Sequence, residues 1–468
     1  MLMHQRLGRS ILFYIIWGVL ILRKYSVLVM SFILLFTLVS PSSLVVAAED
    51  VVDIQSREEI LPLEDGKVLG KDILLQVAQK HIEGYMKDDI QTQGRIVKAS
   101  EDFVPLYDLN DNIFAYLVPL LEGEQEIGYI TLGAIEDGYD AYDIFIKDNA
   151  VSSILGKLSD KTSRARTSTA SNESKLIFLP PMQYVIQTTD DNNQIEYFDI
   201  SNDSQPEVNI TDAVNANLSM IQQQYDGIRN EENKDQYARL LRDVDSPIAY
   251  LASVTPENVS LGAEANYGMF VPVEYSTGNY SYGGDQGWYT TSTKQERGCG
   301  PVAAANITNY LATNKNPATY GALYTGSTLS KTNFLTHMNT LYDYVSPGLL
   351  GEISVSGFAS AVEKYAADKK VKLSRVLDNS SFTLDNTANY VKAGLTINSP
   401  VATLNLSKWS DYNYEWHWMT ITKYYRDSTD SRWIAVSTWG ERRSINYRTH
   451  FDAIVGNKSL GGGFMYFK

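Results

Sequence analysis

Apolar positions along the chain predict helices and strands in separate blocks. From Asp72 to Lys87 apolar residues recur at helical spacing, which predicts one amphipathic helix. The period then changes to that of strands. Three apolar runs separated by polar turns predict an antiparallel meander, at Phe103–Tyr107, Ile113–Val118 and Ile127–Leu132. A helix followed by a meander is an α+β arrangement.

The middle of the chain is less regular. Residues 159–174 are poor in apolar side chains and rich in Ser and Thr, which predicts a flexible linker. Lys175–Ile186 and Gln194–Ile200 then predict a second hairpin, and Ala213–Asp243 predicts mostly helix. Leu251–Asn266 is polar, so we expect a loop that leads into the last domain.

In the C-terminal part, predicted helices precede most of the predicted strands. Helices are predicted at Val302–Leu311, Lys331–Tyr342, Gly357–Ala367 and Leu384–Ala393. Strands are predicted at Phe270–Tyr275, Pro400–Leu406, Trp418–Tyr425, Trp433–Thr438, Arg443–Tyr447 and Gly461–Phe467. The later strands predict a twisted antiparallel sheet, so this part is again α+β.

The N-terminus has the features of a targeting segment. Two apolar runs, Ile11–Leu22 and Val27–Leu38, lie among basic residues and precede the small residues Val46, Ala47 and Ala48. This pattern predicts a signal peptide over residues 1–48, and hence a secreted or cell-surface protein. Because two apolar runs in tandem are unusual for a signal peptide, a retained membrane anchor is the alternative.

Charge is divided unevenly over the chain. Residues 49–260 carry 17 basic and 39 acidic side chains, a net charge of −22, whereas residues 261–468 carry 19 basic and 16 acidic side chains, a net charge of +3. This balance argues against nucleic-acid binding by the whole chain. It also predicts that the two parts attract one another. The alternative is that the acidic part is simply a soluble exported domain.

Cys299 is the only cysteine of the chain, so no internal disulfide is possible. Gly298 and Gly300 permit a tight turn around it, and Pro301 suits the first turn of a helix. We therefore expect the sulfur at a helix N-terminus, where the helix dipole favours a thiolate and backbone N–H groups can stabilise an oxyanion. A buried structural cysteine and an intermolecular disulfide are the alternatives.

These residues resemble a known family. Gln295 and Cys299-Gly-Pro at the start of an Ala-rich helix, with Glu415–Ile421 and Trp433–Gly440 far downstream, resemble papain-like cysteine peptidases, within them the extracytoplasmic branch similar to double-glycine leader peptidases. The resemblance covers roughly the last 200 residues. It implies a helical part plus a twisted antiparallel sheet with the active site between them, and a peptide or protein substrate.

The resemblance also implies roles for particular residues. Cys299 would be the nucleophile and His417 the base. Ser437 occupies the place where the family has Asn or Asp, so the third residue stays open among Ser437, Asp411, Asn413 and Asn446. Gln295 is the preferred oxyanion side chain, with Gln286 as the alternative.

The helix and meander before this domain are similar to propeptides of secreted bacterial peptidases. The expected organisation is a signal peptide at 1–48, an acidic pro-region-like domain at 49–158, a linker at 159–174, a connecting hairpin and helical region at 175–262, and a papain-like domain at 263–468. The pro-region would be an intramolecular partner of the last domain.

Other chemistries have little support in the sequence. Five scattered histidines and one cysteine do not form a metal-ligand pattern, and no phosphate-binding loop or dinucleotide fingerprint is present, so we expect no metal or cofactor. Two alternatives to a peptidase stay open. One is a papain-like surface binding protein with weak or no catalysis, and the other is a cell-wall amidase on the same scaffold.

Overall fold

The helix predicted near residue 72 is present as α2 (Lys71–Glu83). Its apolar side packs against the N-terminal strands. The computed structural model describes residues 67–165, 174–180, 182–189, 194–201, 207–245, 254–348, 353–405, 417–455 and 462–468. All of them belong to one unit, Leu63–Lys468. The predicted signal peptide lies outside the described residues.

The predicted meander is confirmed and is longer than expected. Its strands are β1 (Val97–Ala99), β2 (Val104–Tyr107), β3 (Ile113–Glu122), β4 (Gln125–Gly133) and β5 (Ala141–Ile146). The next region contains β6 (Lys175–Leu179), β7 (Gln183–Thr189), β8 (Ile195–Asp199), β9 (Val208–Asn209), α4 (Thr211–Ala216), α5 (Leu218–Ile228) and α6 (Glu231–Asp245). The segment expected as one strand over Lys175–Ile186 is therefore two paired strands.

The prediction of a flexible linker over residues 159–174 is wrong for its first part, residues 159–165. Helix α3 (Ala150–Ala165) includes residues 159–165, while residues 166–173 lie outside the described part of the chain. Val151, Ile154 and Leu158 recur at helical spacing and pack into the core, and this burial outweighs the polar composition of the helix end.

The prediction of a loop over Leu251–Asn266 is also wrong, because this range contains a strand and a helix. Strand β10 (Glu257–Ser260) pairs with β14 (His417–Arg426), and α7 (Gly262–Tyr267) follows it. Strand pairing fixes β10 although its sequence is polar, because backbone hydrogen bonds form whatever the side chain.

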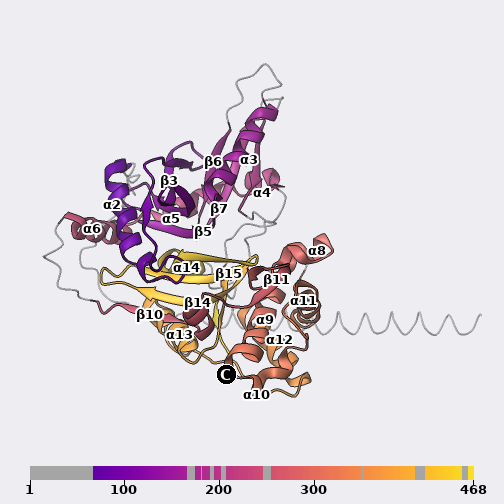
Figure 1. Cartoon of the computed structure of the whole chain (residues 1–468). Helices are drawn as coiled ribbons and strands as arrows, with labels where there is room; N and C mark the ends of the chain where they lie inside the picture. Colours follow the sequence, from indigo (N-terminus) through magenta and orange to yellow (C-terminus); the bar gives the residue numbers. More distant parts are fainter. Residues whose placement is uncertain are drawn as a thin grey trace, which may run out of the picture. The chain divides into compact units, whose positions relative to one another are not determined.

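The C-terminal part contains the predicted helices and strands. Its helices are α8 (Ser292–Arg297), α9 (Cys299–Tyr310), α10 (Pro317–Tyr320), α11 (Lys331–Val345), α12 (Val355–Asp368), α13 (Leu384–Thr396) and α14 (Tyr447–Val455). Its other strands are β11 (Pro272–Ser276), β12 (Asn279–Tyr282), β13 (Val401–Asn405), β15 (Arg432–Thr438), β16 (Glu441–Asn446) and β17 (Gly463–Met465). Helices α9 and α13 pack on β14 (Figure 1).

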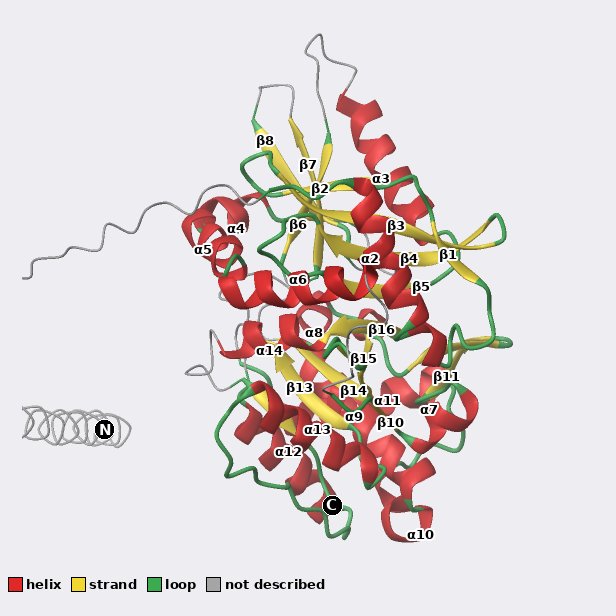
Figure 2. Cartoon of the chain, turned by 90° about the vertical axis from the view of Figure 1, so that its left-hand side faces the viewer, coloured by secondary structure: helices red, strands yellow, loops and turns green. Residues whose placement is uncertain are grey.

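Most of the strands belong to one large sheet. Its order is β17-β13-β14-β15-β16-β5-β4-β3-β2-β6-β7-β8-β9, with β1 beside β3 and β10 beside β14, and nearly all of these 15 strands are antiparallel to their neighbours. The class is therefore α+β, as predicted. A domain boundary was expected between residues 262 and 263. The sheet contains strands from both sides of it, because β16 pairs with β5 (Figure 2). The domain division itself stays a prediction.

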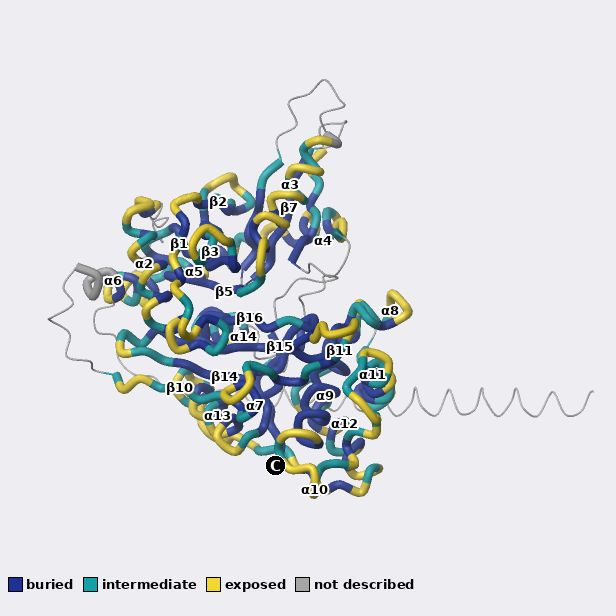
Figure 3. The backbone as a smooth tube through the Cα atoms, in the orientation of Figure 1, coloured by how far each residue is buried: buried dark blue, intermediate teal, exposed yellow. Residues whose placement is uncertain are grey.

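Burial follows this sheet. Strands β14 and β15 are buried along nearly their whole length, and the exposed residues gather on loops and outer helix faces (Figure 3). Helix α9 is buried at all twelve positions, since Ala303, Ala304 and Ala305 let it approach the sheet and α11 closely. Cys299 thus begins a helix at the centre of the C-terminal part.

Candidate active site

Cys299 is the first residue of α9, as the sequence predicts. Gly298 precedes it, and a side chain there would meet the Tyr289 ring at 2.4 Å and the Lys294 carbonyl oxygen at 2.5 Å. Only glycine fits at this position without a rearrangement. Helix α8 before it is capped by Thr291, whose hydroxyl accepts a hydrogen bond from the Lys294 N–H. The sulfur is thus held at the junction of two helices.

His417 is the first residue of β14 and its side chain is 1% exposed. Its ring stacks on Trp439, with 4.5 Å between centroids and 23° between planes. The Nε2 atom lies 2.7 Å from the hydroxyl oxygen of Thr438. The stacking on Trp439 and the contact with Thr438 hold the imidazole ring in one orientation, and this orientation also determines where Nδ1 points.

Cys299 and His417 line the same small pocket. The other lining residues are Gln286, Val302, Ala303, Asn306, Trp418, Ser437, Thr438 and Trp439. The four residues from α9 are at positions i, i+3, i+4 and i+7, which is one face of a helix. The backbone N–H of Trp418, the residue after His417, hydrogen bonds to the sulfur. Helix α9 and strand β14 therefore meet at the predicted nucleophile and base.

The pocket does not favour charges on these two groups. Burial raises the pKa of the Cys299 thiol, and hydrogen bonds from the backbone N–H groups of Trp418, Gly300 and Cys299 itself only partly offset it. Burial lowers the pKa of His417 to about 3. In this arrangement the pair is neutral at pH 7. The thiolate expected at the helix N-terminus is not favoured here, because desolvation outweighs the helix dipole.

Ser437 lines the pocket, but its hydroxyl points elsewhere. Its Oγ donates to the Tyr282 carbonyl oxygen at 2.5 Å and accepts from Asn306 Nδ2 at 3.4 Å. The hydroxyl that reaches the imidazole belongs to the next residue, Thr438. Of the other candidates, Asn446 Nδ2 donates to the Ala141 carbonyl oxygen, and Asp411 and Asn413 lie outside the described residues.

The two glutamines have different surroundings. Gln286 lines the pocket and its Nε2 donates to the Gln295 carbonyl oxygen at 2.9 Å. Gln295 is not among the lining residues, and its Nε2 donates to the carbonyl oxygens of Gly287 and Tyr289 at 3.1 and 2.7 Å. Gln295 therefore holds the loop before α8, and Gln286 is the side chain that faces the sulfur's pocket.

The sequence prediction missed several polar residues of this region. Asn306 accepts from the Gly284 N–H at 2.8 Å, and a polar Asn seven residues after Cys299, on the same face of an Ala-rich helix, was a usable signal. Asn405 lies opposite His417 in the strand register, and both of its amide atoms are buried without a hydrogen-bond partner among the described residues. No signal in its own strand distinguishes Asn405.

No family model matches the sequence, and no curated protein matches it significantly. Among the described residues, no group of three or more His, Cys, Asp or Glu side chains has a metal-binding arrangement. In the same part of the chain, none of the helices has both the length and the hydropathy to cross a membrane.

Proposed function

We propose that this chain is an exported cysteine peptidase that hydrolyses peptide bonds with Cys299 as nucleophile and His417 as base. The observation that supports it most is that a helix N-terminal thiol and an imidazole from a distant strand line one pocket. Nucleophilic catalysis by a thiol needs a base beside it that accepts the proton, and an imidazole that lines the same pocket can be that base.

The proposed chemistry starts from the neutral pair. The Cys299 sulfur attacks the carbonyl carbon of the peptide bond while its proton passes to His417, which has no proton on Nδ1 when Nε2–H donates to Thr438. The carbonyl oxygen gains the negative charge. The Cys299 N–H and the Gln286 amide would stabilise it. The imidazolium then protonates the leaving amine, and water hydrolyses the acyl-enzyme, which restores the thiol.

Thr438 would take the place of the third catalytic residue. Its hydroxyl oxygen can accept from Nε2–H of His417 and hold the ring in the tautomer that the first step needs. A hydroxyl carries no charge, so it stabilises the imidazolium less than a carboxylate would. We therefore expect modest turnover.

A second candidate function is a papain-like binding protein without catalysis. It is favoured by the burial of both groups, since Cys299 is 8% exposed and both pKa shifts oppose the charged pair. A substrate that reaches the sulfur would have to displace part of the pocket wall. Activity distinguishes the two functions directly.

The test is cleavage of a peptide library by the full chain and its variants. We expect the wild type to cleave, and Cys299→Ala and His417→Gln to lose at least a hundredfold in rate. His450→Gln is the matched control, because His450 is also buried, has a pKa lowered to about 3 and has its Nε2 2.8 Å from the hydroxyl of Thr403, but does not line the pocket.

The control should keep most of the activity. Cleavage that survives Cys299→Ala would contradict the peptidase proposal. A folded wild-type chain that cleaves nothing in the library, while it retains peptides, would favour the binding protein.

A further inference from the structure

Strand β16 joins the two oppositely charged parts of the chain. One edge pairs with β15 throughout the strand, and the other pairs with β5 of the N-terminal part at Ser444–Ile144 and Ile445–Asp143. Arg442 and Arg443 are adjacent on β16, so their side chains leave opposite faces of the sheet. Each arginine meets an aspartate from the N-terminal part.

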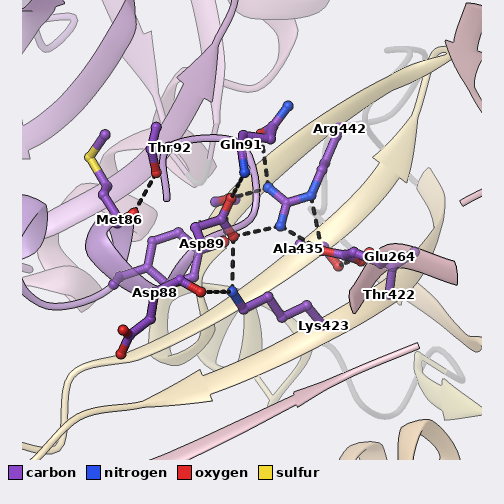
Figure 4. Close-up of polar contacts among 12 residues, drawn as sticks. Met86, Asp88, Asp89, Gln91, Thr92, Glu264, Thr422, Lys423, Ala435 and Arg442 are labelled. Atoms are coloured by element: carbon purple, nitrogen blue, oxygen red, sulfur yellow. Dashed lines mark hydrogen bonds and ion pairs between the residues drawn. The ribbon is translucent and has the colours of Figure 1, made fainter. Parts of the chain in front are cut away.

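On one face, Arg442 lies in a buried group of charges (Figure 4). Its Nη2 is 2.6 Å from both Asp89 Oδ2 and Glu264 Oε1, and its Nη1 donates to Gln91 Oε1 at 2.9 Å. Lys423 Nζ is 3.1 Å from the same Asp89 oxygen and donates to the Asp88 carbonyl oxygen. The four charged side chains are each 3% exposed or less.

On the other face, Arg443 contacts the N-terminal strands and the loop after β8. Its Nη1 lies 3.8 Å from Asp143 Oδ2 and donates to the Tyr129 hydroxyl at 3.3 Å. Its Nη2 donates to the Ser201 carbonyl oxygen at 3.1 Å, and the guanidinium lies 4.2 Å from the centroid of the Phe145 ring. All four of these residues come from the N-terminal part.

The charges on the Arg442 face balance only when the N-terminal part is in place. Arg442 and Lys423 supply two positive charges, and Glu264 is their one acidic partner from the C-terminal part. Burial would raise the pKa of Asp89, but Arg442 and Lys423 hold it well below its ordinary value. Without Asp89, a buried cation would have lost its counter-charge, which is costly in a low dielectric.

We infer that residues 67–245 are a permanent partner of the C-terminal strands, held through β16 by Asp89 on one face and Asp143 on the other, and not a segment that leaves after cleavage. We call these contacts the β16 junction: Asp89, Asp143, Lys423, Arg442 and Arg443. A cut in the chain would leave a non-covalent complex. The expected pro-region would then be a structural part of the mature protein.

The test uses the full chain with a recognition sequence for a site-specific protease inserted between Asp245 and Val254. After complete cutting, we expect both pieces to elute together in size-exclusion chromatography, at low salt and at about 1 M NaCl, because buried ion pairs are screened little by salt. Separate elution of the N-terminal piece under native conditions would overturn the proposal. Separation only at high salt would also overturn it, since that outcome requires surface attraction.

Two substitutions locate the contact. Asp89→Asn should increase the rate at which the cut pieces separate at least tenfold. Lys147→Gln is the matched control, because the Lys147–Glu441 pair joins the same two parts at 2.6 Å but its lysine is 40% exposed. Equal separation rates for Asp89→Asn and the wild type would exclude the β16 junction as the attachment. The salt series needs no substitution, so it tests the proposal even if the Asp89 variant does not fold.

Discussion

At the scale of single residues, burial decides the state of the Cys299 thiol. Its pKa is raised above the ordinary value, so only a small fraction is thiolate at neutral pH. We predict that iodoacetamide labels Cys299 of the folded chain at pH 7.5 at least tenfold more slowly than that of the urea-unfolded chain. The labelling rate should continue to rise with pH beyond 9, because the thiolate is the reactive form. Mass spectrometry measures the labelling.

The single cysteine makes this measurement unambiguous, and the unfolded chain controls for reagent quality. Rapid labelling at neutral pH that His417→Ala slows would instead indicate a thiolate–imidazolium pair, in conflict with the neutral pair described above. The sequence predicted the helix N-terminus correctly from Gly298, Cys299 and Pro301. It did not predict the desolvation, because burial depends on packing partners such as Trp418 and Trp439 that lie far away in the chain.

At the scale of elements, the last two residues of β15, Ser437 and Thr438, differ in whether their hydroxyl contacts the imidazole of His417. Thr438 reaches Nε2 at 2.7 Å, whereas Ser437 donates to the Tyr282 carbonyl oxygen. If the chain is a peptidase, Thr438→Val should lower kcat/KM about tenfold to a hundredfold, the usual range when an outer partner of an active histidine is removed. Thr438→Ser keeps the hydroxyl and should restore most of the loss.

Two further measurements separate positioning from simple structural damage. Thr438→Val should change kcat more than KM, since the imidazole is needed in the transition state. Ser437→Ala should instead lower the free energy of unfolding by about 1 kcal/mol, the usual worth of one hydrogen bond, with kcat nearly unchanged. A Ser437→Ala variant that loses activity while Thr438→Val keeps it would reverse the assignment.

Local sequence patterns predicted most elements but few of their contacts. Strong periodicity located α2, the meander and α9, because each has a clear apolar side. The patterns did not predict β10, which forms because it pairs with β14. They also did not predict the end of α3, because its polar composition obscures the apolar side of the helix. The sequence did not single out Thr438 and named Gln286 only as the alternative to Gln295, because only the folded chain shows which of these side chains lines the pocket.

At the scale of the whole described unit, the charge asymmetry predicted attraction between the two parts but not its location. A sum of charges contains no information on partners, and only the fold brings Asp89 to Arg442 and Asp143 to Arg443. One sheet then passes through both parts at β16. Aromatic contacts add to this, since Tyr85 stacks on Trp433 at 5.3 Å and His81 meets the same ring edge-on.

A continuous sheet with a buried charge cluster on β14 and β16 should unfold as one unit. Between residue 67 and the end of the chain, all tryptophans lie at position 288 or later. Tryptophan fluorescence therefore reports the unfolding of the C-terminal part. Hydrogen exchange of peptides from β3 and β4 follows the N-terminal part. We predict that both report the same urea midpoint, which is the test of a cooperative transition. Loss of protection in β3 and β4 at a lower urea concentration would show two separately stable parts.

The charge cluster also predicts how this stability depends on pH. Asp89→Asn should lower both midpoints together and remove about 3–5 kcal/mol at pH 7, the usual cost of breaking a buried ion pair. Because the pKa of Asp89 is lowered in the folded chain, its contribution is complete above the ordinary carboxylate pKa of about 4 and is lost as the pH falls below it. The wild type and Asp89→Asn should therefore differ fully at pH 7 and progressively less below pH 4. A difference that stays the same from pH 7 down to pH 3 would mean that Asp89 has an ordinary pKa in the folded chain, and hence that Arg442 and Lys423 do not hold it.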